Sequence, residues 1–289
     1  MKIAVAGGTG FVGSNLLDSL KEGHETVCID RNRSDVSDKS VVADVSESSE
    51  YQEALEDVDV AFYLIHGMSQ GGDFSEIERE CAEAFRDACG EAGVDRIIYL
   101  TGMIPDGKLS KHMESRTKTG EILGSGDPDL TEVGAAIILG WQGSSFQIMY
   151  QIVKKLPVIL GPRSLNSKVQ PIHIDDVIYY LEELMTDDEA RGEYVEIGGP
   201  EVFSYGELLE ILGKQTGRRP LLLRVPFLTP RLSSYGMRFV TDVDYSLAKA
   251  LVESIKHDMV VRNDSIDRFV EHECMSYRDS IQKILDERK

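Results

Sequence analysis

The sequence predicts an α/β protein with a doubly wound parallel sheet and a smaller C-terminal lobe. In the first half of the chain, short apolar runs alternate with longer segments whose apolar residues recur at helical spacing, a pattern typical of repeated strand–helix units. The first unit, residues 3–20, joins its strand to its helix through a glycine-rich turn. The length of 289 residues suffices for one large sheet and a smaller lobe, but not for two large domains.

The turn of this first unit has the spacing Gly-x-x-Gly-x-x-Gly. In a nucleotide-binding turn, Gly7 permits the tight bend, Gly10 lets the backbone approach a pyrophosphate, and Gly13 lets the helix pack closely on the strand. The helix begins near Phe11 and Val12, and its N-terminus faces the anion. We therefore expect these five residues to bind a dinucleotide.

The second apolar run ends at Asp30, seventeen residues after Gly13, where an adenine-ribose hydroxyl requires an acceptor. The next residue, Arg31, favours NADP(H) instead, because its guanidinium can pair with a 2′-phosphate. It can also stack on adenine. We expect NAD(H) to be preferred and NADP(H) to be the alternative, because the Asp30 carboxylate repels a 2′-phosphate and Arg31 can turn away.

Two further strand ends are expected to reach the cofactor. The third short strand ends at Asp44 and Val45, where the carboxylate either contacts an adenine amino group or caps the next turn. The apolar run 58–65 has the composition of a parallel strand buried on both faces, and it ends at Ile65 and His66. Ligands bind at this carboxyl edge of a parallel sheet.

The next segments continue the alternation of strands and helices, but the last part of the chain does not. We expect an amphipathic helix at 74–88, a strand at 97–100, a loop at 101–111, a helix at 112–123 and a buried strand at 133–139. We divide the chain into a dinucleotide-binding Rossmann domain, residues 1–155, and a substrate lobe, residues 156–289, of which 170–200 return to the Rossmann sheet. Beyond about residue 221 the pattern predicts no topology.

The composition limits the classes of partner. The formal charge of −19, from 50 acidic and 31 basic residues, disfavours nucleic acid and anionic membrane surfaces. It fits either a well-solvated acidic surface or a halophile's protein, whose self-repulsion is screened by salt. Without an apolar stretch of about 20 residues or a signal peptide, we expect a cytoplasmic protein with no membrane span. The four cysteines have no paired spacing, so we expect neither a metal site nor a disulfide.

Several stretches together resemble the extended and atypical short-chain dehydrogenase/reductase superfamily, especially its NmrA-like and YbjT-like branch. They are the glycine turn at 7–13, Asp44-Val45, the strand end at 63–66, the segments 170–177 and 196–200, and the late stretch 228–235. The resemblance implies a Rossmann fold that binds NAD(H) or NADP(H), with the substrate held by the C-terminal segments.

The chain departs from this family at the catalytic positions. Catalytic members carry Ser or Thr after the fifth strand and a Tyr-x-x-x-Lys pair on the next helix. Here the first position holds Thr101 or, in the alternative alignment, Gly102, and the pair is replaced by His112 and Arg116. Thr101 can donate a hydrogen bond to a carbonyl, and Arg116 can bind ribose hydroxyls but is too basic to relay a proton. His112 is either a proton donor that titrates near pH 6 to 7 or a surface or capping residue.

Two functions of different class follow from the resemblance. One is an oxidoreductase that transfers hydride between nicotinamide and a small carbonyl, alcohol or quinone-like substrate. The other is a non-catalytic NAD(P)-binding sensor or assembly protein, which the missing Tyr–Lys pair favours. Sugar-nucleotide epimerase is the weaker alternative, because epimerisation depends most on the absent tyrosine. The sequence identifies neither the small-molecule substrate nor the oligomeric state.

Overall fold

The computed structural model describes residues 1–65, 74–105, 107, 109–225, 256–262 and 266–288. Its centre is a seven-stranded sheet in the order β11-β6-β5-β4-β1-β2-β3, in which every neighbouring pair is parallel. The predicted doubly wound α/β fold is thus confirmed. The strands are β1 (Lys2–Ala6), β2 (Glu25–Asp30), β3 (Lys39–Val42), β4 (Val60–Tyr63), β5 (Arg96–Gly102), β6 (Asp129–Ala135) and β11 (Tyr194–Ile197).

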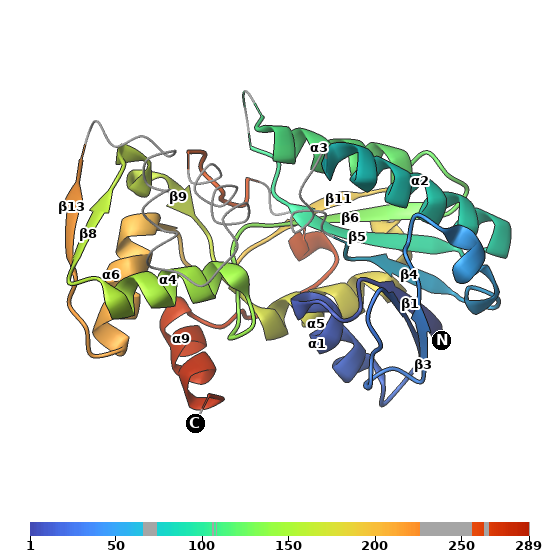
Figure 1. Cartoon of the computed structure of the whole chain (residues 1–289), viewed down its shortest axis with the longest axis horizontal. Coiled ribbons are helices and arrows are strands. Elements are labelled where there is room, and N and C mark those ends of the chain that lie inside the picture. The colour runs from blue at the N-terminus through green and yellow to red at the C-terminus, as the bar shows by residue number, and fades with distance from the viewer. Residues whose placement is uncertain (66–73, 106, 108, 226–255, 263–265, 289) are drawn as a thin grey trace.

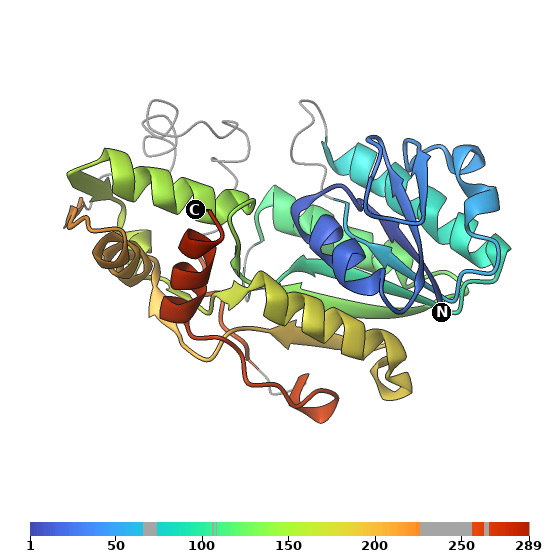
Figure 2. The same ribbon diagram turned by 90° about the horizontal axis from the view of Figure 1, so that it is seen from below.

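Helices cover both faces of this sheet. Figure 1 shows α2 (Phe74–Ala92) and α3 (Lys111–Leu123) above it, and α1 (Phe11–Leu20) and α5 (Ile174–Thr186) below it. Seen from below, α1 in blue and α5 in yellow lie on the same face (Figure 2). Because successive side chains of a strand alternate between faces, the five inner strands β1, β2, β4, β5 and β6 supply apolar residues to both layers. The result is two apolar cores, one on each side of the sheet.

The smaller part of the molecule has its own apolar core. It contains α4 (Ser144–Lys155), α6 (Tyr205–Gln215) and α9 (Tyr277–Asp286). Three two-stranded sheets join β7 (Ile138–Leu139) to β10 (Ile172–His173), β9 (Lys168–Val169) to β12 (Phe203–Ser204), and β8 (Val158–Gly161) to β13 (Leu221–Arg224). Short 3-10 turns are η1 (Ser48–Glu50), η2 (Gln52–Ala54), η4 (Arg163–Asn166), η5 (Asp188–Ala190) and η6 (Ile266–Arg268).

The buried strand expected at 133–139 is instead two strands in two different sheets. β6 stays in the large sheet as far as Ala135, which pairs with Gly102 and Ile197. The chain then leaves this sheet, and β7 pairs with β10. The apolar run hid this break because both parts are buried, β6 in the large sheet and Leu139 in the core of the smaller part. Burial alone does not distinguish one long strand from two short ones.

Segments late in the chain also build the large sheet. β11 pairs along its whole length with β6, from Tyr194 opposite Glu132 to Ile197 opposite Ala135. α5 packs against α1, at the other end of the sequence. Arg96, which is fully buried at the start of β5, donates hydrogen bonds to the carbonyls of Leu184 and Asp187 at the end of α5. The large sheet is therefore built by residues from both halves of the chain.

Candidate functional site

The glycine turn between β1 and α1 is too tightly packed for side chains. Gly7 has a φ of 83°, in the left-handed region, and a Cβ there would lie 3.0 Å from the backbone of Leu64, just after the neighbouring strand β4. A Cβ on Gly13 would lie 2.3 Å from the Gly7 carbonyl oxygen. The N-cap of α1 is Gly10, which brings no side-chain acceptor to the first-turn amides. This bare backbone cradle at a helix N-terminus fits the pyrophosphate of a dinucleotide.

Asp30 lies beside the cradle at the carboxyl end of β2. One oxygen of its half-buried carboxylate accepts a hydrogen bond from the Thr9 amide (3.1 Å), and the other accepts one from the Asn32 amide (3.1 Å). These bonds fix the carboxylate at the rim of the glycine turn, where the ribose hydroxyls of a dinucleotide need an acceptor. Arg31 is exposed next to it.

Of the other residues predicted to bind the cofactor, some pack against the protein core and others lie at the edge of the site. Phe11 fills the space at Gly140, where a Cβ would lie 2.4 Å from its ring, and it packs partly buried against the core beneath α1. Val12 is half-buried against the core beneath α1. Asp44 accepts hydrogen bonds from the Ser46 amide (3.1 Å) and hydroxyl (2.9 Å), which is the turn-capping role considered above.

Two of the expected site residues lie where β3 and β4 end. Val45 is buried, and its carbonyl accepts a hydrogen bond from the Tyr51 hydroxyl (2.8 Å). The Ile65 carbonyl accepts a hydrogen bond from Arg116 Nη1 (2.9 Å), across the edge of the sheet from α3. His66, also expected at this edge, lies outside the described residues.

Arg116, which the resemblance places where catalytic members of that superfamily carry a lysine, is one half of a buried ion pair. Arg116 Nη2 lies 3.0 Å from Glu78 Oε1 of α2, and both side chains are at most 5% exposed. Ser115 donates a hydrogen bond to the same carboxylate, and Tyr99 lies 3.5 Å from Arg116 Nη1. The guanidinium therefore joins α2, α3 and the end of β4.

His112, one turn before Arg116 on α3, does not have the ionisation expected of a proton donor. Burial, together with the positive charge of Arg116, lowers the pKa of its imidazole to about 4, although the negative charge of Glu78 raises it. The titration expected near pH 6 to 7 is therefore wrong for the folded protein. At neutral pH the imidazole is uncharged, and a neutral imidazole is a poor acid.

Thr101 lies at the carboxyl end of β5 as expected. Its side chain is 3% exposed, and its hydroxyl has no hydrogen-bond partner among the described residues. Its neighbour in β6 is Gly134, and a Cβ there would lie 2.5 Å from the hydroxyl of Tyr194. This hydroxyl donates to Glu196 (3.2 Å) and accepts from the Ile104 amide (3.4 Å).

Glu78, Tyr194 and Glu196 were not expected at the site from the sequence. A signal existed for Glu78, because it lies three residues before Cys81 and therefore on the apolar face of α2, where a carboxylate needs a partner. Glu196, which is fully buried, bonds to the backbone and guanidinium of Arg262. No local pattern marks that pair, because its members are 66 residues apart.

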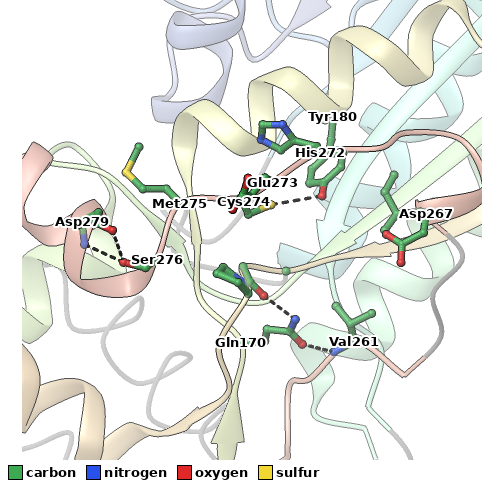
Figure 3. Close-up of a pocket in the computed structure, with 14 residues that line it drawn as sticks. Gln170, Tyr180, Val261, Asp267, His272, Glu273, Cys274, Met275, Ser276 and Asp279 are labelled. Atoms are coloured by element: carbon green, nitrogen blue, oxygen red, sulfur yellow. Dashed lines mark hydrogen bonds between the residues drawn. The ribbon is translucent and has the colours of Figure 1, made fainter.

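A cavity of about 670 Å³ lies between the loop after β11 and the C-terminal segment. Figure 3 shows His272, Cys274 and Tyr180 at its wall, with the Tyr180 hydroxyl 3.3 Å from Cys274 Sγ. Ligand atoms of Asp176, His272 and Cys274 lie within 4.8 Å of one another. Asp176 is already shared by His272 Nε2 (2.8 Å) and the Met275 amide (3.1 Å), so this group ties the C-terminal segment to α5.

Comparison with known proteins gives one family match and two curated relatives. Residues 7–123 match the family described as NAD(P)H-binding. The chain is 22% identical over 239 residues to the mitochondrial NADH-ubiquinone oxidoreductase 40 kDa subunit of Neurospora crassa, and spans 60% of that protein's length. It is 28% identical over 122 residues to the mitochondrial NADH dehydrogenase [ubiquinone] 1 alpha subcomplex subunit 9 of Arabidopsis thaliana, and spans 30% of it.

Solved structures share the fold over nearly the whole chain. A nucleoside-diphosphate-sugar epimerase from Staphylococcus aureus superimposes with a TM-score of 0.78 at 14% identity, covering 98% of this chain and all of that one. A short-chain dehydrogenase/reductase superfamily protein from Agrobacterium tumefaciens with bound NAD gives 0.67 at 14% identity, covering 89% and 97%. Within the described residues, no helix is long and apolar enough to cross a membrane.

Proposed function

We propose that this chain, which carries an NAD(P)-binding Rossmann domain of the extended short-chain dehydrogenase/reductase fold, holds NAD(H) as a bound ligand of a sensor or assembly protein. The observation that carries the proposal is the glycine cradle at residues 7–13, whose Gly10 N-cap leaves the first-turn amides of α1 to an anion. The match of residues 7–123 to the NAD(P)H-binding family supports it.

Each part of the dinucleotide has a matching group in the chain. In this proposal the amides around Gly10, Phe11 and Val12 hold the pyrophosphate, and Asp30 accepts hydrogen bonds from the adenine-ribose hydroxyls. The same carboxylate repels a 2′-phosphate, which favours NAD(H) over NADP(H). When bound, the nicotinamide supplies the capacity to donate or accept hydride.

The groups beside the expected nicotinamide position are poorly suited to proton transfer. Catalytic relatives pair that hydride with a proton from a tyrosine whose pKa a lysine lowers. Here His112 is uncharged at neutral pH, and Arg116 is held in its ion pair with Glu78. Burial raises the pKa of Tyr194, so its phenol is not an activated substitute. These features favour a dinucleotide that stays bound as a ligand over one that is oxidised or reduced in catalytic turnover.

Calorimetric titration with NADH and NADPH, followed by an assay of nicotinamide absorbance, tests the proposal. We expect NADH to bind more tightly than NADPH. We also expect no absorbance change when small carbonyls, alcohols and short-chain quinones are added to the NADH or NAD⁺ complex. Sustained turnover with any of them would contradict the ligand role, and absence of dinucleotide binding would overturn the whole proposal.

An oxidoreductase is the second candidate, and the buried hydroxyl of Thr101 favours it. This hydroxyl lies at the carboxyl end of β5 without a partner among the described residues, where it can donate a hydrogen bond to a small carbonyl, alcohol or quinone-like substrate. Turnover that falls in Thr101→Val while NADH affinity stays constant would support it. A sugar-nucleotide epimerase is the weakest alternative, because the tyrosine on which that reaction depends is replaced by His112.

A further inference from the structure

The two-stranded sheet of β8 and β13 exposes an apolar face. The strands are parallel, with Val158 opposite Leu221 and Leu160 opposite Leu223. These four side chains are 41%, 57%, 56% and 44% exposed, respectively. Figure 1 shows this sheet at the left end of the molecule, away from the Rossmann sheet. We call these four residues the strand-pair face.

The opposite side of the same two strands packs into the protein. Ile159 is buried, and Leu222 packs with it against the core of the smaller part. The alternation along β8 and β13 is therefore regular, but it is apolar on both faces rather than apolar inside and polar outside. An exposed apolar cluster of this kind marks a surface that is covered by something else.

Basic side chains gather at one end of the strand-pair face. Lys154 and Lys155 end α4 just before β8, and Arg218 and Arg219 lie just before β13. All four residues are exposed. Because the strands are parallel, both begin at the same end of the small sheet, so the two basic pairs are brought together although they are more than 60 residues apart in the sequence.

The stretches of sequence that contain the two strands have no acidic residues. The chain contains 50 aspartates and glutamates, yet residues 133–174 and 211–241 contain none. β8 lies in the first of these stretches and β13 in the second. The strand pair therefore joins the two acid-free stretches of a protein whose net charge is −19. The average charge, which disfavours anionic surfaces as partners, does not describe this surface.

We propose that the strand-pair face is a docking surface for an anionic lipid bilayer. Apolar side chains that enter the boundary between headgroups and acyl chains, together with neighbouring Lys and Arg residues that attract anionic headgroups, are the two components of peripheral membrane binding. The four apolar residues supply the first component, and Lys154, Lys155, Arg218 and Arg219 supply the second. A second copy of the chain is a poorer occupant, because its own strand-pair face offers basic pairs and no opposite charge to complement them.

Flotation of the full-length protein with lipid vesicles tests this proposal. The vesicles consist of phosphatidylcholine alone, or of phosphatidylcholine partly replaced by phosphatidylglycerol. We expect binding to the anionic vesicles, weaker binding to the neutral ones, and a decrease as salt rises. Arg218→Glu/Arg219→Glu should weaken binding by about 20-fold or more, since each basic residue near an anionic surface contributes roughly a five-fold factor.

A second variant isolates the apolar component. Leu221→Ser/Leu223→Ser should weaken binding by at least about 10-fold, because less apolar surface is transferred from water. Two controls change the same residue types elsewhere. Lys21→Glu/Lys118→Glu reverses two exposed lysines on the Rossmann helices, and Val202→Ser removes an exposed valine between β11 and β12. Unchanged NADH affinity and melting temperature show that each variant is folded.

The outcomes separate the bilayer from other occupants. Binding to anionic vesicles that both strand-pair variants lose and both control variants keep supports the proposal. Equal binding to neutral vesicles, or equal loss in the controls, overturns it. Full binding by Leu221→Ser/Leu223→Ser also overturns it, because the attraction is then that of the basic pairs alone. Absence of vesicle binding overturns it in favour of an acidic protein partner.

Discussion

The glycine cradle and the Glu78–Arg116 cluster both lie at the carboxyl edge of the sheet, but they are built in different ways. The cradle is made of backbone from seven consecutive residues, and its shape follows from missing side chains. The cluster is made of side chains from α2 and α3, 38 residues apart in the sequence. A short motif can therefore specify the first, whereas the second depends on how two helices pack. The following four experiments test this contrast, from the largest expected effect to the smallest.

Replacing one partner of the buried ion pair should have the largest effect. Arg116→Met leaves the Glu78 carboxylate buried without its cation, which typically costs about 3 to 5 kcal/mol of unfolding free energy. Urea unfolding measures this loss. The double variant Glu78→Gln/Arg116→Met should recover part of the stability. Arg79→Met, which removes an exposed arginine of the same helix that pairs with Glu76 and Glu83, should change stability little. Equal losses in both single variants would show that burial of the pair is unimportant.

The low pKa of His112 should make the protein less stable in mild acid. The imidazole has a pKa of about 4 when folded and 6.5 as its reference value, so the unfolded chain binds more protons between these values. Stability is therefore complete above about pH 6.5 and falls as the pH drops towards 4, by up to about 3 kcal/mol. Urea unfolding of wild type and His112→Gln from pH 4.5 to 7 should show a shallower slope in the variant. Equal pH dependence of the unfolding free energy in the two proteins would show that the histidine is exposed to solvent.

Adding one methyl group to the cradle should affect binding more than folding. A Cβ on Gly13 would lie 2.3 Å from the Gly7 carbonyl oxygen, so Gly13→Ala must distort the turn. Overpacking of this kind costs about 1 to 3 kcal/mol, and we expect NADH binding to be largely lost. Calorimetric titration and thermal melting measure the two effects. The control is Gly23→Ala, because no atom lies within 4 Å of a Cβ at that position. NADH binding that survives Gly13→Ala would place the cofactor elsewhere.

Removing the Asp30 carboxylate should change cofactor preference with a smaller effect on affinity. Asp30→Ala deletes the acceptor for the ribose hydroxyls and the repulsion of a 2′-phosphate, so NADH should bind about 10-fold more weakly and NADPH more tightly. Asp35→Ala, an exposed aspartate in the next loop, is the matched control. Tighter NADPH binding by the wild type, or no gain in Asp30→Ala, would show that the preference is wrongly assigned.

The fold could be predicted from the sequence where local patterns suffice. The helix expected at 112–123 is α3 at Lys111–Leu123, and the apolar run at 58–65 contains β4. The smaller part was not predictable, because the pairing of β8 with β13 joins strands some 60 residues apart. In both strands the exposed and buried residues are equally apolar, so the periodicity that marks a half-buried strand is missing.

The candidate site, like the fold, could be predicted from the sequence only where local patterns suffice. The positions of Gly7, Gly13 and Asp30 follow from spacing, because a strand–turn–helix unit fixes where each residue lies. The ionisation of His112 does not, because it depends on burial and on the charge of Arg116. A single sequence gives the reference pKa of a residue, and tertiary packing determines the departure from it.

β11 comes some 60 residues after β6 in the sequence, although the two strands are neighbours in the large sheet, and this affects how the protein folds. Until residues 194–197 have been added, β6 presents an unpaired edge with free backbone amides and carbonyls, which other chains can use to aggregate. Pairing across some 60 residues must also overcome a loop-closure entropy that more local contacts avoid. Expression of residues 1–155 alone should therefore yield insoluble material, even though that segment contains the whole cradle.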